Sequence, residues 1–357
     1  MEIVIIVFSC ILIALSLLPF VQNQHWVFRV PEFAKLQILI LQVLALVGSF
    51  LFIQDAVTLW IIDAVQIALL IYHGYIFIRY TKFWKARKRS TRAANSALVK
   101  ILSCNIYQFN KEYDRFLDLV KEQKPDIVLT MESDSKWEAA LRVLEKEYPY
   151  QQKVTLDNTY GMHFYSKLKV KKVQTHFFVA DDLPSIEAEL ETEDGFRFVF
   201  FGVHPPPPSP TEEETSKERD GDLMCIAKKV KDYELPVLVT GDFNNVAWAR
   251  SSILFKKTSE LIDARIGRGI LATFHAKYWF FRVPLDLVFH SPDIFIDNLV
   301  IYPSVGSDHF PMGCSFHINE HDKRQEEEVD ELERGEMKEV NELIEEGIDE
   351  QSDNRND

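Results

Sequence analysis

The chain has 357 residues, of which 47% are hydrophobic, and a net charge of −14, so it is long enough for two or three structural units. The acidity is local, because residues 320–357 hold 17 acidic and 5 basic residues and the remainder is close to neutral. This distribution excludes a strong overall basic field of the kind that drives nonspecific binding to nucleic acid. The four cysteines form no C-x-x-C pair, which argues against a zinc site or a disulfide framework and favours buried structural thiols.

The first 80 residues predict a three-helix transmembrane anchor. Residues 3–20, 36–53 and 59–78 are each predominantly apolar over the ~20 residues that a bilayer's hydrocarbon core requires. A cleavable signal peptide is disfavoured, because only Met1 and Glu2 precede the first segment and neither side chain is basic. The chain is therefore predicted to be an integral, multi-pass protein of the inner or cell membrane.

Basic residues predict how this anchor is oriented. A juxtamembrane linker at residues 81–96 is rich in lysine and arginine, the first loop carries Arg29 and Lys35, and the short second loop carries only Asp55. By the positive-inside rule, the first loop and the chain after the third segment lie in the cytoplasm. The linker would also bind anionic lipid headgroups, and the opposite orientation stays open.

Two polar residues, Asp63 and Gln66, interrupt the third apolar segment. A carboxylate at this depth is costly and often functional. The alternative is that Asp63 lies near the membrane edge or pairs with a polar group inside the bundle.

Residues 97–318 have the pattern of an α/β domain. Short apolar runs predict buried strands, and the longer amphipathic stretches between them predict helices. The predicted strands are 98–104, 127–131, 163–165, 198–203, 237–240, 285–289 and 312–316, and the predicted helices are 111–123, 136–148 and 216–233. Strands that alternate with helices indicate layered sheets.

Polar residues lie at the ends of most of these strands. They are Asn105, Glu132, His204, Asp242 with Asn244, Asp286, and Asp308 with His309. Taken singly, each is explained by a turn, a helix cap or a structural histidine.

Taken in this order, the set resembles the endonuclease/exonuclease/phosphatase superfamily, which has the deoxyribonuclease I-like fold. The resemblance covers about residues 98–316 and implies a four-layer α/β sandwich, in which two packed mixed β-sheets are flanked by helices. It implies a metal-dependent hydrolase of phosphoric esters. The chain is similar in particular to a bacterial membrane-anchored subgroup, from which no substrate can be transferred. The shared segments are WVFRVPEF before a span, YGMHFYS, HPPPP followed by Arg219 and Asp220, GDFNNVAWA, and GRG with ATFHA.

The resemblance implies a metal site made of oxygen ligands. Glu132 would be the principal ligand of Mg²⁺ or Mn²⁺, with Asp308 as a second carboxylate and Asn105 hydrogen-bonded in the metal shell. Hard oxygen ligands suit these ions. An anionic phosphate ester repels nucleophiles, so its hydrolysis needs such a supply of positive charge.

The resemblance also implies roles for the remaining residues. Asp242 would orient or deprotonate the attacking water, and Asn244 would hold a phosphate oxygen. His204 and His309 would donate to the pentacoordinate phosphorus centre. Asp286 would fix the tautomer and orientation of His309.

Three further residues are candidates for substrate binding, each with a structural alternative. Arg268, in a Gly-Arg-Gly loop, could clamp a phosphate or lie on the surface of a turn. Arg219 could reach the site from the helix after the proline run or form a structural ion pair. Tyr160 could line the substrate groove or pack in the core.

The identity of the phosphate ester stays open between lipid and nucleic acid. Arg265, Arg268, Lys277 and Arg282 with Tyr278, Trp279 and Phe280 form a basic and aromatic cluster of the kind that suits a nuclease. Residues 276–281 could equally be an apolar lip that faces the bilayer. A tethered enzyme lies close to lipid headgroups, which favours a phospholipid or lipid-linked phosphodiester.

Two other predictions concern partners. A non-catalytic membrane scaffold should have lost some of the site residues, and none is missing. Residues 319–357 are predicted to form an acidic, disordered tail. A helical spacing in residues 329–348 could serve a partner, although an unpartnered, frayed helix is the simpler interpretation, and no obligate protein partner is indicated.

Overall fold

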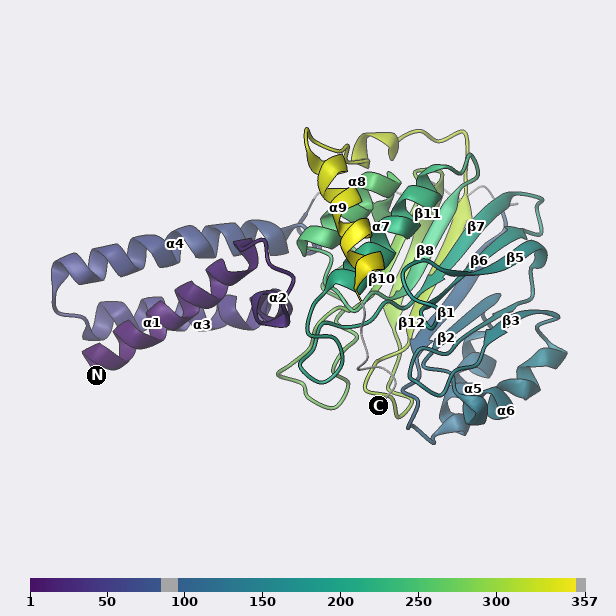
Figure 1. Ribbon diagram of the computed structural model, residues 1–357, viewed down its shortest axis with the longest axis horizontal. Coiled ribbons are helices and arrows are strands. Elements are labelled where there is room, and N and C mark those ends of the chain that lie inside the picture. Colours follow the sequence, from purple (N-terminus) through teal and green to yellow (C-terminus); the bar gives the residue numbers. More distant parts are fainter. Residues whose placement is uncertain (85–95, 351–357) are drawn as a thin grey trace.

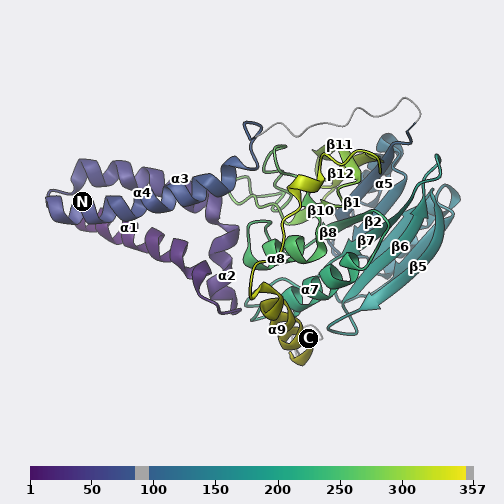
Figure 2. The same cartoon turned by 90° about the horizontal axis from the view of Figure 1, so that it is seen from above.

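The computed structural model describes residues 1–84 and 96–350. A bundle of long helices projects from one side of a larger α/β domain, so the molecule is elongated (Figures 1 and 2). The bundle helices are α1 (Glu2–Leu17), α3 (Lys35–Phe52) and α4 (Ala56–Ile78). Each, with the turn that extends α1, is long and apolar enough to cross a membrane. Three apolar helices are thus present where the sequence predicts them.

Polar side chains inside the bundle bond to one another. Ser49 Oγ donates to Asp63 Oδ1 (2.5 Å), and Gln66 Nε2 donates to Ser9 Oγ (3.1 Å). An unpaired carboxylate is costly among apolar helices. These bonds favour the structural alternative for both polar residues of the third segment, while Asp63 Oδ2 and Gln66 Oε1 are buried with no hydrogen-bond partner in the described chain.

The connection between the first two bundle helices is helical, whereas the sequence was interpreted as a loop there. A short 3-10 helix, η1 (Leu18–Phe20), ends the first segment, and α2 (Trp26–Phe33) follows it. The predicted linker at 81–96 lies mostly outside the described residues, and with it Lys85, Arg87, Lys88, Arg89 and Arg92.

Two six-stranded mixed sheets form the α/β domain. The first, in spatial order, is β11 (Ile294–Ile301), β12 (Met312–Ile318), β1 (Val99–Asn105), β2 (Ile127–Met131), β4 (Met162–Ser166) and β3 (Tyr150–Val154). The second is β5 (Lys169–Phe177), β6 (Pro184–Glu191), β7 (Arg197–Val203), β8 (Val237–Asp242), β10 (Asp286–His290) and β9 (Ile262–Asp263). In each sheet one central pair is parallel, β1 with β2 and β7 with β8, and the other pairs are antiparallel.

The apolar side chains of the two sheets pack against each other and make the central core. Helices α7 (Lys217–Lys231) and α8 (Arg250–Ser259) cover the outer face of the second sheet. The outer face of the first sheet packs on α5 (Tyr113–Gln123), α6 (Ser135–Leu141) and the 3-10 helix η2 (Arg142–Lys146). The predicted four-layer α/β sandwich is confirmed.

The acidic tail is ordered up to residue 350, which corrects the prediction of a disordered extension. Helix α9 (Glu336–Asp349) lies along α7 after a short 3-10 helix, η3 (Glu326–Glu328) (Figure 1). Val340 is fully buried in the core beneath it. Arg250 forms an ion pair with Glu336 at 2.8 Å. The helical spacing therefore has a partner within the chain, because α7 and α8 bury the apolar face of α9.

The bundle is packed onto the domain. Phe77 and Tyr80, at the end of α4 and just beyond it, contact the ring of Trp248 (centroids 5.0 and 5.6 Å apart), and all three belong to the core beneath α7 and α8. Trp248 Nε1 donates to the carbonyl oxygen of Glu32 in α2 (2.9 Å). The chain before α2 also pairs with the segment before α7, where Trp26 N donates to Glu214 O (2.9 Å).

Candidate active site

Strand register brings the predicted site residues to one edge of the sandwich. Asn105 at the end of β1 pairs with Met131 at the end of the parallel strand β2, so Glu132 follows directly beside it. In the second sheet Asp242 at the end of β8 is opposite Asp286 at the start of β10. Parallel central pairs in the two sheets thus direct their polar carboxyl ends toward a common centre.

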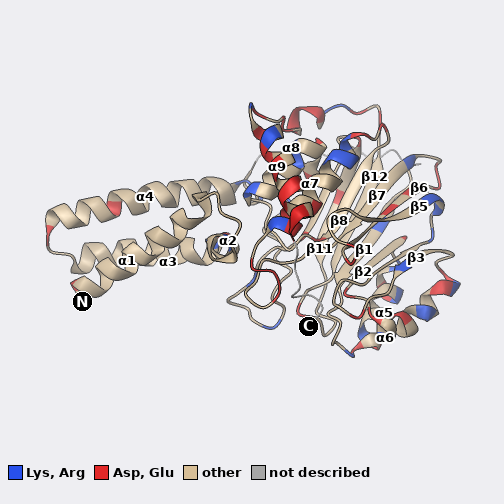
Figure 3. Ribbon diagram, in the orientation of Figure 1, with Lys and Arg blue, Asp and Glu red and all other residues tan. Residues whose placement is uncertain are grey.

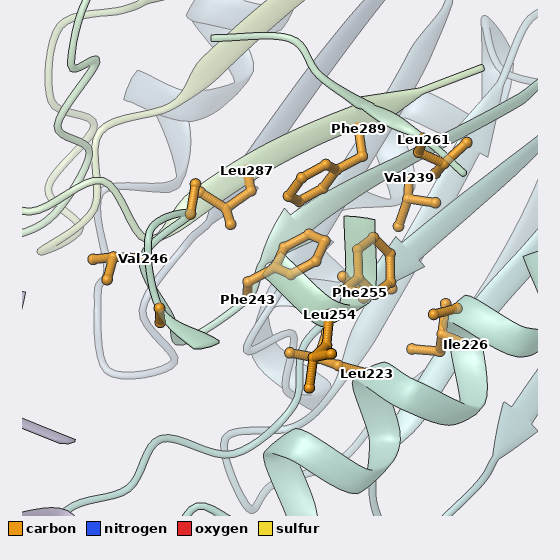
Figure 4. Packing of buried hydrophobic residues seen from close by; sticks show 14 of the residues in the cluster. Leu223, Ile226, Val239, Phe243, Val246, Leu254, Phe255, Leu261, Leu287 and Phe289 are labelled. Atoms are coloured by element: carbon orange, nitrogen blue, oxygen red, sulfur yellow. The ribbon is translucent and has the colours of Figure 1, made fainter. Parts of the chain in front are cut away.

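The loop after β8 is fixed by packing. A side chain at Gly241 (φ +149°) would bring its Cβ to 2.0 Å from the carbonyl oxygen of Val203, so only glycine fits there. Phe243 is fully buried, with its ring 5.4 Å from that of Phe255 and 5.3 Å from that of Phe289 (Figure 4). The buried Phe243 holds the preceding Asp242, which is itself 1% exposed and faces Asn105 and His309, at the sheet edge.

Asn105 connects the two carboxylates across the sheets. Its Nδ2 donates to Glu132 Oε1 (2.8 Å) and to Asp242 Oδ2 (3.1 Å), and its Oδ1 accepts from Tyr107 N (3.0 Å). Glu132 also accepts from Gln108 N (3.0 Å). Glu132 itself has a positive φ of 61°, a strained conformation that is typical of functional positions.

His309 is held between two carboxylates. Its Nδ1 lies 2.9 Å from Asp286 Oδ2, and its Nε2 lies 3.4 Å from Asp242 Oδ2. Burial lowers the pKa of His309, but Asp242 and Asp286 outweigh burial and raise the pKa to about 10. The ring is therefore an imidazolium at neutral pH, and the contact with Asp286 is suited to orienting it.

His204 approaches the same carboxylate from the other side. Its Nε2 is 3.9 Å from Asp242 Oδ2, and burial lowers its pKa to about 4, so the ring is neutral at pH 7. Asn244 N donates to Asp242 Oδ1 (2.9 Å), and Asn244 Nδ2 donates to Pro205 O (2.9 Å), which ties this loop to the strand end that carries His204.

The charge balance of the site favours a cation. Asp308 is partly exposed beside Glu132, and together with Asp242 and Asp286 these carboxylates outnumber the one imidazolium. Burial raises the pKa of Glu132 to about 7, although hydrogen bonds to the carboxylate oppose the shift. Such a site repels a phosphate ester until positive charge is added.

The donor set suits Mg²⁺ or Mn²⁺. No group of three or more His, Cys, Asp or Glu side chains is clustered as a ready metal cage among residues 1–84 and 96–350. Mg²⁺ is commonly held by one or two carboxylates and keeps several waters. Glu132 and Asp308 provide two such carboxylates, and Asn105 orients the first of them.

Several residues that support this site carry no clear signal in the sequence. Ser307 Oγ donates to Asn105 O (2.7 Å) and accepts from His309 N (3.0 Å), which fixes the loop that carries Asp308. Thr273 Oγ1 accepts from Asp286 N (3.2 Å). A serine hydroxyl that accepts from the backbone N–H two residues on is a known turn pattern, and Ser307 follows it, whereas Thr273 is brought to the site only by the fold.

The three predicted substrate-binding residues have internal partners. Arg268 donates to the carbonyl oxygens of Ala264 (2.6 Å) and Ile296 (2.9 Å). Arg219 is buried, pairs with Asp220 and donates to Asn244 O (3.1 Å).

Tyr160 is fully buried and donates to Glu212, with its ring 5.5 Å from the ring of His204. For all three residues the geometry favours the structural alternatives. Arg219 still contacts the backbone of Asn244, and the ring of Tyr160 still contacts that of His204.

The chain belongs to the endonuclease/exonuclease/phosphatase family, whose sequence model matches residues 102–309, more than half of the chain. This match spans every residue of the site described above. Comparison with curated proteins finds no significant match.

Solved structures share the fold of the α/β domain at low identity. Humanized D. rerio TDP2 has 16% identity and a TM-score of 0.53, over 62% of this chain and 99% of that one. The human Nocturnin catalytic domain has 17% identity and a TM-score of 0.52, over 62% and 95%. An endonuclease/exonuclease/phosphatase protein from Bacteroides vulgatus has 22% identity and a TM-score of 0.51, over 62% and 99%.

Proposed function

We propose that the chain is a membrane-anchored, divalent-metal-dependent hydrolase that cleaves a phosphodiester in a lipid or lipid-linked substrate. The observation that carries the proposal is the environment of Asp242. Its carboxylate lies 3.4 Å from the imidazole of His309 and 3.9 Å from that of His204, and it accepts from Asn105, which also holds Glu132. Family membership agrees with a phosphoester hydrolase. The three apolar helices agree with a membrane anchor.

In the proposed reaction Asp242 orients the attacking water and accepts its proton. His309, charged and held by Asp286, donates from Nε2 to a phosphoryl oxygen as negative charge develops there. His204, neutral, donates one hydrogen bond to the same group. Asn244 is proposed to hold a phosphate oxygen at the rim, where it is 8% exposed.

Glu132 and Asp308 would hold Mg²⁺ or Mn²⁺, with Asn105 keeping Glu132 in place. The chemistry that a bound ion supplies is neutralisation of the phosphate charge and polarisation of a phosphoryl oxygen. The protein's own part is to hold these two carboxylates close together, which costs free energy through their mutual repulsion when the ion is absent.

An aromatic lip beside the site supports a lipid substrate. Tyr278, Trp279 and Phe280 are 51%, 80% and 62% exposed. Gln37, in the first turn of α3, donates to Phe280 O (3.3 Å), so the lip lies level with the start of an apolar span. Exposed aromatic side chains at this level are typical of the membrane interface.

The same lip is joined to the site. Ala276 N donates to Asp308 O (2.6 Å), and the ring of Phe274 lies 5.0 Å from that of His309. A headgroup phosphate at the interface would therefore be within reach of the site without leaving the bilayer.

A nuclease is the alternative function. One related fold, D. rerio TDP2, was solved with a single-strand DNA product, which favours testing nucleic acid. Two residues of the basic cluster, however, are used internally. Arg265 is buried against Asp263, and Arg268 bonds to backbone carbonyls. Lys277 and Arg282 are left exposed at the lip, a small number of cations for a path along a nucleic acid backbone.

The test is hydrolysis by the full chain in lipid nanodiscs with Mg²⁺ or Mn²⁺. The panel contains phospholipids, a generic phosphodiester, a phosphomonoester, and single- and double-stranded DNA. We expect metal-dependent cleavage of a phospholipid or lipid-linked phosphodiester, reduced at least about 100-fold by Asp242→Asn or Glu132→Gln. Asp118→Asn, an exposed substitution of the same kind on α5, is the matched control and should keep full activity.

Faster cleavage of DNA than of any lipid would replace the proposed substrate class by nucleic acid. Equal rates for the wild type and both site variants, with all three folded, would favour a scaffold without catalytic activity.

A further inference from the structure

A cavity lies away from the active site, where the helical bundle meets the α/β domain. Its volume is about 720 Å³, within the ~300–1,000 Å³ typical of small-ligand sites. Its walls come from η1, α2, the ends of α3 and α4 that face the domain, α8 and α9. None of the active-site residues discussed above lines it.

The wall nearest the bundle carries unbalanced positive charge. Lys35, which begins α3, is 4% exposed, and its ammonium lies 5.8 Å from the centre of the Tyr72 ring. Arg29 Nε is buried with no hydrogen-bond partner in the described chain. Glu32, between them, is 5% exposed and supplies one negative charge against two positive charges. Buried cations without a full set of partners are costly, so this wall favours an anion.

The opposite wall carries negative charge. Glu342 and Glu346 project from α9, which lies on the domain side of α2 in both views and carries most of the acidic residues of this region (Figures 1, 2 and 3). The other acids of this wall are paired, Glu342 with Lys338 at 2.5 Å and Glu339 with Arg250, and Lys217 pairs with Glu350. Glu346 has no ion pair within the described chain, so this position favours a cation.

The edge of the cavity nearest the bundle is apolar. It is lined by Phe20, which ends the first span, and by Val21, which follows it. From the bundle outward the cavity therefore presents an apolar edge, then Arg29 and Lys35, then the acids of α9. A phospholipid with an amine headgroup has the same order, with acyl chains, phosphate and ammonium.

We propose that this cavity binds one zwitterionic aminophospholipid, whose phosphate contacts Arg29 and Lys35 and whose ammonium faces Glu346. The lipid is a resident ligand that fills the junction between bundle and domain. It is not the substrate, and its binding does not depend on the proposed hydrolase activity. Lipid binding would also explain why α9 is acidic on the side of the cavity. Its packing against α7 uses Val340 and Gly347 and does not require these acids.

The experiment is native mass spectrometry of the full chain after reconstitution with equal amounts of phosphatidylethanolamine and phosphatidylglycerol. We expect retention of one phosphatidylethanolamine per chain. Lys35→Met and Arg29→Gln should each weaken retention about tenfold through loss of a charge-assisted contact. Glu346→Gln should reduce the preference for the amine headgroup and leave retention of phosphatidylglycerol unchanged.

Lys121→Met and Glu122→Gln, exposed on α5 far from the cavity, are the matched controls. Melting curves in detergent establish that each variant is folded. One folded variant, Lys35→Met or Arg29→Gln, is sufficient to test the contact with the phosphate. Equal retention of both lipids by the wild type would overturn the proposal. So would unchanged retention in folded variants, or full protection against heat by inorganic phosphate alone.

Discussion

At the scale of residues, the site depends on pairs that lie far apart along the chain. Asp286 and His309 are 23 positions apart and lie in contact at 2.9 Å. Asn105 and Asp242 come from different sheets and still lie within hydrogen-bond distance. The family resemblance implied the pair of Asp286 and His309, whereas the contact between Asn105 and Asp242 was not predicted. Both pairs lie at one edge because polar residues that follow buried strands collect there.

Replacement of Asp286 by asparagine should mainly lower kcat. The carboxylate orients the imidazole of His309 and keeps it charged, and loss of such a partner typically costs about 10- to 100-fold. We expect a fall of this size in kcat with KM nearly unchanged, measured on the substrate that the panel identifies. Asp297→Asn is the matched control, because it removes a similar contact to His317 (2.7 Å) on strands β11 and β12 outside the site. A loss of activity equal to that of the control would contradict the assigned role.

Asp222 should make the stability of the protein depend on pH. This residue is buried in α7, and burial raises the pKa of its carboxyl to about 8. Between about pH 4 and pH 8 the folded state keeps a proton that the unfolded state has released, so the free energy of unfolding falls as pH rises through this window.

Asp222→Asn removes the ionisable group and should raise the free energy of unfolding by about 5 kcal/mol at pH 8, with little gain at pH 4. Thermal unfolding in detergent at a series of pH values measures the effect. An equal change at both pH values would show that the group does not titrate in this window.

At the scale of elements, the position of α9 is set by a close crossing of two glycines. A Cβ on Gly347 would lie 2.8 Å from the carbonyl oxygen of Lys217 and 2.9 Å from Gly221 Cα, so neither helix has room for a side chain at the crossing. The acidic, charged composition of the tail suggested disorder because it contains few apolar residues. A narrow stripe around Val340 and two glycines were enough to pack it.

Gly347→Ala should therefore displace α9 from α7. The added methyl group would force α9 and α7 apart by at least several tenths of an ångström at the crossing of Gly347 and Gly221. We therefore expect faster hydrogen exchange in residues 336–349, with exchange in the rest of the domain unchanged. Gly74→Ala, in α4 with open space around the position, is the control and should leave exchange in α9 as it is. Unchanged protection of α9 in Gly347→Ala would contradict the close crossing.

At the scale of the whole molecule, the bundle and the α/β domain share a core. Trp248 lies in the segment that follows Asp242, yet it packs on Phe77 and Tyr80 and bonds to the backbone of Glu32. The segment GDFNNVAWA thus serves both the candidate site at its start and the junction at its end. The domain is held in one orientation relative to the three apolar helices, with the lip at Tyr278–Phe280 close to the start of α3.

Trp248→Ala should loosen this junction. Loss of a buried tryptophan costs about 3–5 kcal/mol, and here the cost falls on the contact between bundle and domain. We expect faster hydrogen exchange in α2 and in the last turn of α4 for the full chain in nanodiscs. Trp60→Ala, on the exposed surface of α4, is the control. Protection of α2 equal to that of the wild type would show that the junction does not depend on Trp248.

Local patterns along the chain were sufficient to predict the three apolar helices, the central strands and the polar residues at the strand ends. Apolar length and strand composition reflect burial directly, and order along the chain carried the family resemblance. Strands such as β5 (KVKKVQTHF) were missed, because an exposed edge strand has no continuous apolar run.

Contacts between distant segments were decided by tertiary structure alone. Arg219 and Arg268 could have faced a substrate or the interior, and the choice depends on backbone carbonyls that no local pattern reveals. The order of α9, the helical first loop and the charged cavity between bundle and domain have the same origin. Each arises where two surfaces meet, and the free energy of such a contact belongs to the pair of surfaces rather than to either segment of sequence.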